Sequence, residues 1–486
     1  MNHTEEKLGT ESLGSLMLSM GIPTLVAQMI NLLYNIVDRV YIGQGVGREA
    51  LTGLGLTLPA ITIVSAFSAL AGAGGAPLAA IALGQGDRKK AERITGNVFM
   101  LLCVFSAIVM LVFYAAQKPF LYLVGASDAT YPYASEYLSI YLIGTICVQI
   151  VLGLNPFITA QGQSKTAMGS VLIGAALNIV LDPIFIFVFH MGVKGAALAT
   201  ILSQLAGAIW VLRFMTSKKT SLRLKCACLR PDFPQIGAIL SLGMAPFIMQ
   251  STESLISIVM SSGLQRYGGD LYVGSLTILQ SIMQLTSAPI NGFTQGVQPI
   301  LSYNFGAGNL ERVKAGYRRI IGITAAVSFV ITLLEILFPE ALARMFTQDE
   351  ELIALVGRVA PVFLAGMLLF GIQMGCQTTF IGLGQAKISL FVAMLRKVIL
   401  LVPFALIFPL VTGNVYSIYF AECMADIISV ITCIALFVLK IRKILERGPI
   451  AISYITANNP VHHSVKSCVR YLCRASAHHT ANNGTT

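Results

Sequence analysis

Long apolar segments recur along the chain and are separated by short connections that contain Gly, Pro or charged residues. They show no sustained alternation of polar and apolar positions, and a run of about 20 apolar residues is enough to cross a bilayer as an α-helix. Unbroken apolarity therefore favours helices over a β-barrel. The pattern predicts an all-α integral membrane protein with twelve transmembrane helices, near residues 15–43, 50–83, 94–115, 132–161, 165–190, 193–216, 235–266, 272–303, 315–338, 352–382, 387–410 and 414–440.

The composition supports lipid as the solvent for most of the chain. Of the 486 residues, 55% are hydrophobic and only 11% are charged, whereas soluble proteins carry about 25% charged residues. The first apolar segment is too long for a cleaved signal peptide, so we expect it to remain as a membrane helix.

The net charge of +11 has a clear distribution along the chain. Basic residues gather in every second connection, as is typical of cytoplasmic loops. This predicts a multi-pass protein of the cell inner membrane with both termini in the cytoplasm, and it explains the charge without a nucleic-acid partner. The predicted cytoplasmic set comprises Arg88, Lys89, Lys90, Arg93, Lys165, Lys218, Lys219, Arg223, Lys225, Arg230, Arg312, Lys314, Arg318, Arg319, Lys387, Lys440, Arg442, Lys443 and Arg447.

An internal repeat organises the chain. A shift of 222 residues superposes Gly21 on Gly243, and it carries Gly162, Gln163 and Lys165 onto Gly384, Gln385 and Lys387. An even number of helices in each half gives both halves the same orientation, which is typical of alternating-access carriers whose two lobes flank a central cleft. We therefore predict a cytoplasmic N-terminal segment, an N-lobe with helices 1–6, a basic inter-lobe loop, a C-lobe with helices 7–12 and a disordered cytoplasmic tail, over residues 1–14, 15–216, 217–234, 235–445 and 446–486.

Polar residues inside the N-lobe helices are the first candidates for chemistry. Asp38 interrupts the apolar stretch NLLYNIVDRVYIG, and a carboxylate inside a membrane helix is costly. Depth along the helices, at about 1.5 Å per residue, places Asp38, Asn178, Asp182 and Thr200 in the outer half of the N-lobe. Pro183 should loosen the helix beside Asp182. These groups suit an oxygen cage for a coupling cation.

The C-lobe lacks an equivalent cage. The 222-residue shift takes the four N-lobe residues onto Met260, Leu400, Phe404 and Glu422. Glu253, which falls on Asn31, is a candidate second cation site or a contact for cationic substrate.

Three further charged residues lie inside C-lobe helices. Arg396, Glu422 and Asp426 are interpreted as an intramembrane charge cluster that holds the lobe together, with a substrate role as the alternative.

Several strings resemble the multidrug and toxic compound extrusion (MATE) family, notably MGIPTLVAQMINLLYNIVDRVYIG, ITAQGQSKTA, LNIVLDPIFIF and TQGVQPILSYNFGAGN. The resemblance implies a two-lobed efflux carrier driven by a proton or sodium gradient, with organic cations as common substrates. It also implies that Asp38, Asn178, Asp182 and Thr200 form the coupling site. Accessory or substrate-cleft candidates are Asn31, Tyr34, Asn35, Asn155 and Glu253.

These observations predict a secondary active multidrug exporter that confers antibiotic resistance. No nucleotide-binding motif or paired catalytic residues appear, so we expect no ATP, no enzymatic activity, no cofactor beyond H⁺ or Na⁺, and function as a monomer. The alternative is a flippase of a lipid-linked precursor or a dedicated metabolite carrier, which a cleft rich in Arg would favour. Outside the loops the basic residues are mainly Arg39 and Arg396, so export of small organic compounds is preferred. An intramembrane enzyme and a structural scaffold are the competing classes.

Overall fold

A computed structural model describes residues 3–46, 48–225 and 230–448. The first half contains α1 (His3–Thr10), α2 (Leu13–Gly45), α3 (Arg48–Gly84), α4 (Arg88–Leu123), α5 (Tyr131–Ile143), α6 (Thr145–Ala160), α7 (Ser164–Pro183), η1 (Ile184–Val188) and α8 (Gly192–Thr216). The second half contains α9 (Phe233–Gly268), α10 (Asp270–Gly306), α11 (Leu310–Leu337), α12 (Pro339–Ala343), α13 (Glu350–Leu364), η3 (Ala365–Leu369), α14 (Phe370–Gly382), α15 (Ala386–Met394), η4 (Leu395–Leu401), α16 (Val402–Thr412) and α17 (Tyr416–Arg447).

Each predicted helix has a counterpart, but four of them are interrupted. The segment 132–161 divides at Gly144 into α5 and α6, with a bend of 58°. The segment 165–190 changes to a π-helix directly after Pro183, which has no amide to donate to the preceding turn. The other two interruptions are the 3₁₀ turn η3 and the π-helix η4. The predicted tail, 446–486, lies outside the described residues beyond Gly448.

Ten helices of the described residues are long and apolar enough to cross a membrane, or eleven if the bent pair α5–α6 counts as one span. α10 occupies the place of the predicted eighth helix but is not among them. Its amide and hydroxyl side chains lower its hydropathy. The twelve-helix prediction therefore holds approximately, because hydropathy alone does not mark α10 as a span.

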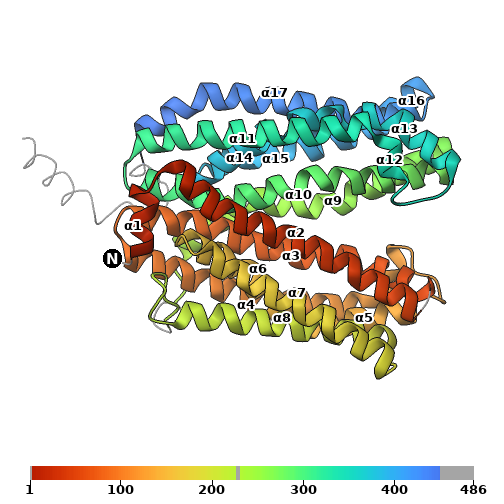
Figure 1. Ribbon diagram of the computed structural model, residues 1–486, viewed down its shortest axis with the longest axis horizontal. Coiled ribbons are helices and arrows are strands. Elements are labelled where there is room, and N and C mark those ends of the chain that lie inside the picture. The colour runs from red at the N-terminus through yellow and green to blue at the C-terminus, as the bar shows by residue number, and fades with distance from the viewer. Residues whose placement is uncertain (1–2, 47, 226–229, 449–486) are drawn as a thin grey trace, which may run out of the picture.

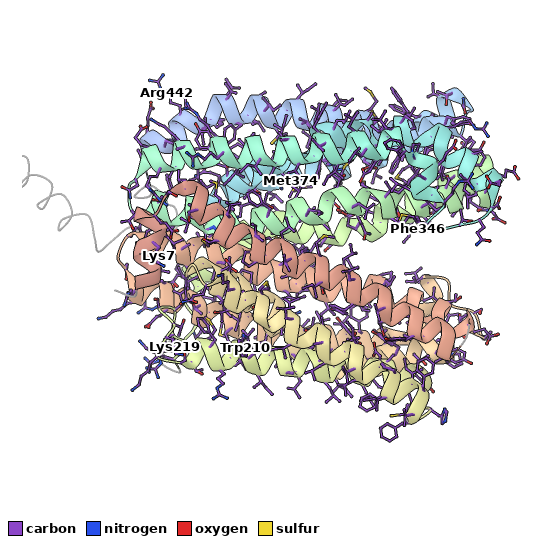
Figure 2. The ribbon with its side chains drawn as sticks, viewed as in Figure 1. Lys7, Trp210, Lys219, Phe346, Met374 and Arg442 are labelled. Carbon is purple, nitrogen blue, oxygen red and sulfur yellow. The ribbon has the colours of Figure 1, made fainter. Side chains whose placement is uncertain are left out.

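The helices form two elongated lobes, α2–α8 and α9–α17, that lie side by side (Figure 1). α1 lies at one end of the bundle, and Lys7, Lys219 and Arg442 gather at that same end, while Phe346 lies at the opposite end (Figure 2). Basic residues of both lobes thus share one end of the bundle.

The lobes meet backbone to backbone along a seam of glycines near the α1 end. A Cβ atom on Gly243 of α9 would lie 1.8 Å from the carbonyl oxygen of Leu70 in α3, and one on Gly74 would lie 2.2 Å from that of Ile239. The repeat-related approach is between α2 and α10, where a Cβ on Gly296 would lie 2.9 Å from the Cα of Gly21. Small residues allow membrane helices to approach this closely.

α1 is attached to the C-lobe beneath this seam. Leu8 is fully buried, and its carbonyl oxygen accepts a hydrogen bond from Asn304 Nδ2 at 2.9 Å. Arg312 donates to the carbonyl oxygen of Glu11 at 2.7 Å. A cavity of about 270 Å³ adjoins α1 and is lined by Lys7, Glu11, Leu16, Ser19, Gly162, Gln163 and Lys165. The N-terminal helix therefore closes this end of the bundle.

Candidate ion and substrate sites

The N-lobe site is built from α2 and α7. Asp38 of α2 is 8% exposed, and Asp182 of α7 is fully buried. Asn178 lies one turn before Asp182 and donates from Nδ2 to Asp182 Oδ1 at 3.3 Å. The carboxyl groups of Asp38 and Asp182 are in electrostatic contact with each other. The structure thus brings the predicted acid pair together.

Two more helices complete this site. Tyr137 of α5 is buried and interacts with Asp38, Tyr34 and the hydroxyl of Thr200 in α8. Tyr34 also interacts with Tyr141, one turn after Tyr137. Tyr137 and Tyr141 were missed by sequence reasoning because aromatic residues in an apolar helix resemble ordinary core.

The site offers unused oxygen atoms. Within the described part of the chain, Asn178 Oδ1 and Asp182 Oδ2 are buried without a hydrogen-bond donor, and Asp182 forms no ion pair there. Buried polar atoms normally have partners. Carboxylate, amide and hydroxyl oxygens are the ligands that a hard cation prefers. The arrangement can hold a proton or a monovalent cation between α2 and α7.

The accessory candidate residues lie in different parts of the N-lobe. Asn155 of α6 donates to Ser170 Oγ at 2.8 Å, and Ser170 precedes Asp182 by about 18 Å along α7. Asn155 therefore lies away from the acid pair. Asn31 is partly buried on α2, and the side chain of Asn35 lies outside the described part of the structure.

The C-lobe holds an ion-paired cluster around Arg396. Its Nε donates to Asp426 Oδ1 at 2.5 Å, and its Nη2 lies 3.7 Å from Glu422 Oε1. The guanidinium also covers the ring of Phe370, with 5.2 Å between Cζ and the ring centroid. The structure therefore brings the three predicted residues together.

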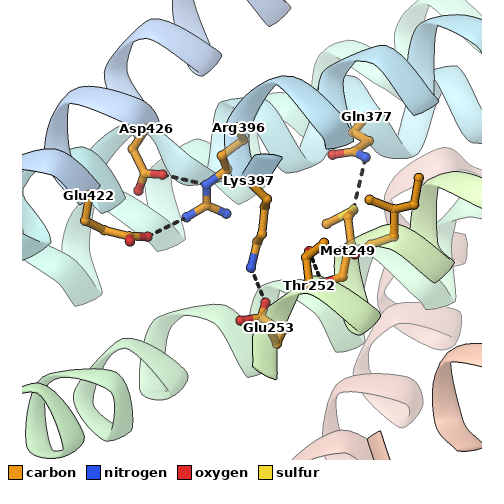
Figure 3. Close-up of polar contacts among 9 residues, drawn as sticks. Met249, Thr252, Glu253, Gln377, Arg396, Lys397, Glu422 and Asp426 are labelled. Carbon is orange, nitrogen blue, oxygen red and sulfur yellow. Dashed lines mark hydrogen bonds and ion pairs between the residues drawn. The ribbon is translucent and has the colours of Figure 1, made fainter. Parts of the chain in front are cut away.

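A second cation, Lys397, extends this cluster to α9 (Figure 3). Its Nζ donates to Glu253 Oε1. Lys397 is buried in η4. The sequence-based statement that the basic residues outside the loops are mainly Arg39 and Arg396 therefore overlooked it. The adjacent letters RK within an apolar run were the available signal. Pro403, two residues after η4, lacks an amide, which favours an irregular turn here.

Three of the four C-lobe positions that correspond to the N-lobe cage belong to an apolar cluster. Met260 is buried in a hydrophobic cluster, against which Leu400 and Phe404 pack. Glu422, the counterpart of Thr200, belongs to the Arg396 cluster.

One buried acid escaped the sequence prediction altogether. Glu335 of α11 is 2% exposed and its Oε1 accepts a hydrogen bond from Thr286 of α10 at 2.8 Å. The acid in the apolar run TLLEIL was the signal for it.

A comparison with known families decides the identity. The MatE family model matches residues 23–184 and again residues 246–407, more than half of the chain. The chain belongs to the MatE family. The two matches repeat one pattern in each half, in agreement with the internal repeat. MATE proteins are transporters, and this one is a multi-pass membrane protein.

Individual relatives agree with this assignment. The chain is 26% identical over 410 residues to the multidrug export protein MepA of Staphylococcus haemolyticus, covering 84% of this chain and 90% of that protein. MepA of Staphylococcus aureus strain N315 is also 26% identical over 413 residues, with the same coverage.

Solved transporter structures share the fold. An outward-facing multidrug resistance MATE transporter of the MOP superfamily superposes with a TM-score of 0.85 at 22% identity, covering 92% of this chain and all of that chain. A MOP superfamily transporter from Pyrococcus furiosus, described as having a binding pocket of reverse polarity and a suggested different function, also has a TM-score of 0.85 at 22% identity, covering 91% and 99%.

Proposed function

We propose that this MATE protein is a secondary active multidrug exporter that exchanges H⁺ or Na⁺ for small amphipathic organic compounds, often cationic ones. The buried acid pair of the N-lobe carries the proposal. Asp38 and Asp182 interact closely inside a membrane lobe, and two such carboxyl groups cannot both be ionised cheaply without a bound cation. A cation from outside relieves that cost.

Coupling follows from the elements that hold these acids. Asp38 belongs to α2, which also forms the glycine seam with the C-lobe. Asp182 belongs to α7, whose turn type changes one residue later. Cation binding alters the partners that the carboxyl groups need, so the packing of α2 against α7 changes. The seam transmits this change to the contact between the lobes.

The lobes make their close backbone contact at one end of the bundle, and we base the alternating-access proposal on this contact. The glycine seam and α1 close the bundle at the end that carries the basic loops. With that end in the cytoplasm, as the positive-inside rule indicates, the glycine seam is the cytoplasmic gate of the proposed cycle. Transport requires this seam to open in one of its stages. The protein works as a monomer in the inner membrane, with both termini cytoplasmic.

The alternative, a flippase of a lipid-linked precursor or a dedicated metabolite carrier, gains one observation from the structure. Lys397 doubles the basic groups inside the C-lobe helices relative to Arg396 alone. Both cations already contact carboxylates, however, so they do not form a free anion site, and export of organic cations remains the preferred function.

Reconstituted protein tests the proposal directly. Proteoliposomes should move a cationic dye under an imposed pH or sodium gradient, and the gradient that drives the movement identifies the coupling ion. Asp38→Asn and Asp182→Asn should each reduce gradient-driven efflux to the level of empty liposomes, because they remove the titratable cation ligand.

Asp128→Asn is the matched control, since this acid is exposed and, among the described residues, accepts a hydrogen bond from Tyr122 alone. It should transport as the unmodified protein does. Undiminished transport by Asp38→Asn at normal membrane expression would contradict the coupling role, and transport of an anionic lipid in place of the dye would favour the alternative.

A further inference from the structure

The C-lobe cluster has unequal numbers of acidic and basic groups. Three carboxyl groups, those of Glu253, Glu422 and Asp426, share two cations, Arg396 and Lys397. With all five groups ionised, the cluster carries one negative charge. A net charge inside a membrane lobe is costly, and one additional monovalent cation would balance it.

The five side chains differ in how much of their surface is exposed. Arg396, Glu422 and Asp426 are buried, with side chains less than 10% exposed. The Lys397 side chain is 9% exposed, yet its partner Glu253 is 55% exposed. The lysine therefore reaches from a buried stem toward a carboxylate that lies open on one side (Figure 3). A charged group half exposed in the middle of a membrane helix borders water rather than lipid.

Glu253 lies directly beyond the contact between the lobes. Phe247, about 9 Å earlier along α9, packs its ring against Phe67 of α3, with centroids 5.2 Å apart. The sulfur of Met249 accepts a hydrogen bond from Gln377 at 3.1 Å. Met249 lies one turn before Glu253 on the same face of α9, and a polarizable thioether near a carboxylate suits an amphipathic organic cation.

Lys397 also interacts electrostatically with a second acid. Glu422 interacts electrostatically with Lys397 and with Glu253, and the contact of Glu422 with Arg396 is long, at 3.7 Å. An ammonium that leaves Glu253 therefore stays in the field of a second carboxylate, Glu422. Such a move exposes the Glu253 carboxylate to an incoming cation while Lys397 remains near an acid.

We propose that Lys397 is a tethered cation that occupies Glu253 until a monovalent organic cation displaces it. The proposal rests on the proposed export of cationic compounds. Lys397 then determines the affinity for such substrates, because the binding-competent state is the minor one in which Glu253 is vacated. An apparent dissociation constant rises as the competent fraction falls, so a lysine that occupies the acid nine-tenths of the time weakens binding about tenfold.

Binding of tetraphenylphosphonium to the full-length protein in nanodiscs tests this role. Lys397→Gln should bind the cation about tenfold more tightly than the unmodified protein, since no internal cation competes. The gain should vanish in the double variant Lys397→Gln with Glu253→Gln, because the vacated acid is what the cation uses. Binding that is no tighter in Lys397→Gln, or a gain that survives in the double variant, would overturn the proposal.

Lys397→Arg is the control for a loss of folding, because it keeps the positive charge inside the cluster. A guanidinium can pair with both carboxylate oxygens, so binding of tetraphenylphosphonium should be equal to that of the unmodified protein or up to about threefold weaker. Tighter binding would overturn the tethered-cation role. If the unmodified protein neither binds nor transports tetraphenylphosphonium, the proposed export of organic cations fails as well, whereas normal transport with unchanged affinity in Lys397→Gln rejects only the role of Lys397.

Discussion

The two lobes repeat one helix pattern but differ in how their main clusters of buried acids are partnered. In the N-lobe, Asp182 meets another acid and forms no ion pair within the described residues. In the C-lobe, each buried acid of the Arg396 cluster meets a cation. An acid pair responds strongly to an incoming cation, whereas an ion-paired cluster is largely satisfied already. This difference supports the proposed division of roles, in which the N-lobe binds the coupling ion and the C-lobe cluster provides cohesion with a substrate contact at its exposed edge.

Removal of Arg396 should have the largest effect on stability. Arg396→Met leaves Glu422 and Asp426 buried without their cation, and breaking a buried ion pair in this way costs about 3–5 kcal/mol. We expect a large fall in the thermal midpoint of the purified protein. The variant that also carries Glu422→Gln and Asp426→Asn should recover most of the loss. No recovery would mean that Arg396 acts through packing on Phe370 rather than through charge.

Transplanting an acid into the C-lobe should also be costly. Met260→Asp places a carboxyl group where Asp38 would lie after the repeat shift, inside an apolar cluster. An unpaired Asp at the centre of a membrane helix costs about 2.5–3.5 kcal/mol. Thermal unfolding should show this loss, and flux assays should show no second coupled ion. A stable variant with altered ion stoichiometry would show that the lobes are interchangeable.

The glycine seam should tolerate substitution less well than other glycines. Gly243→Ala would place a methyl group 1.8 Å from a carbonyl oxygen of the other lobe, and overpacking of this kind costs about 1–3 kcal/mol. Spin-label distances across the seam should increase and transport should slow. Gly322→Ala is the control, because nothing lies within 4 Å of its added Cβ. Equal behaviour of the two variants would exclude the seam as the closing contact.

The smallest effect is expected for an exposed ion pair of the N-lobe. Lys194 Nζ lies 3.3 Å from Glu136 Oε1, with side chains 54% and 42% exposed. Surface pairs of this kind contribute about 0–1 kcal/mol, so Glu136→Gln should change the thermal midpoint little. A loss as large as that of Arg396→Met would show that exposure does not separate the two classes of ion pair.

Much of the fold could be predicted from sequence, because hydropathy and the 222-residue repeat are long-range signals carried by many residues. The juxtaposition of Asp38 and Asp182 was predictable from depth along the helices. Helix interruptions were harder to predict: Pro183 marked one in advance, but η3 and the bend at Gly144 depend on packing between helices.

The main limit of prediction from the sequence was the identity of the contact partners of individual side chains. Nothing in the sequence states that Lys397 reaches Glu253, since two helices and a π-turn must be placed first. Tyr137 likewise becomes part of the N-lobe site only when α5 packs against α8. Asn155 shows the converse, because a resemblance grouped it with the acid pair while the structure pairs it with Ser170.

The glycine seam also determines how the lobes can part. Where Gly74 of α3 faces Gly243 of α9, main chain rests on main chain, whereas beside Gly21 of α2 the side chains of Phe293 and Val297 fill the contact. At Gly74 the lobes can part by losing weak dispersion contacts gradually, but at Gly21 they must also withdraw the Phe293 ring. We therefore expect the α2–α10 contact to offer the greater resistance when the lobes separate.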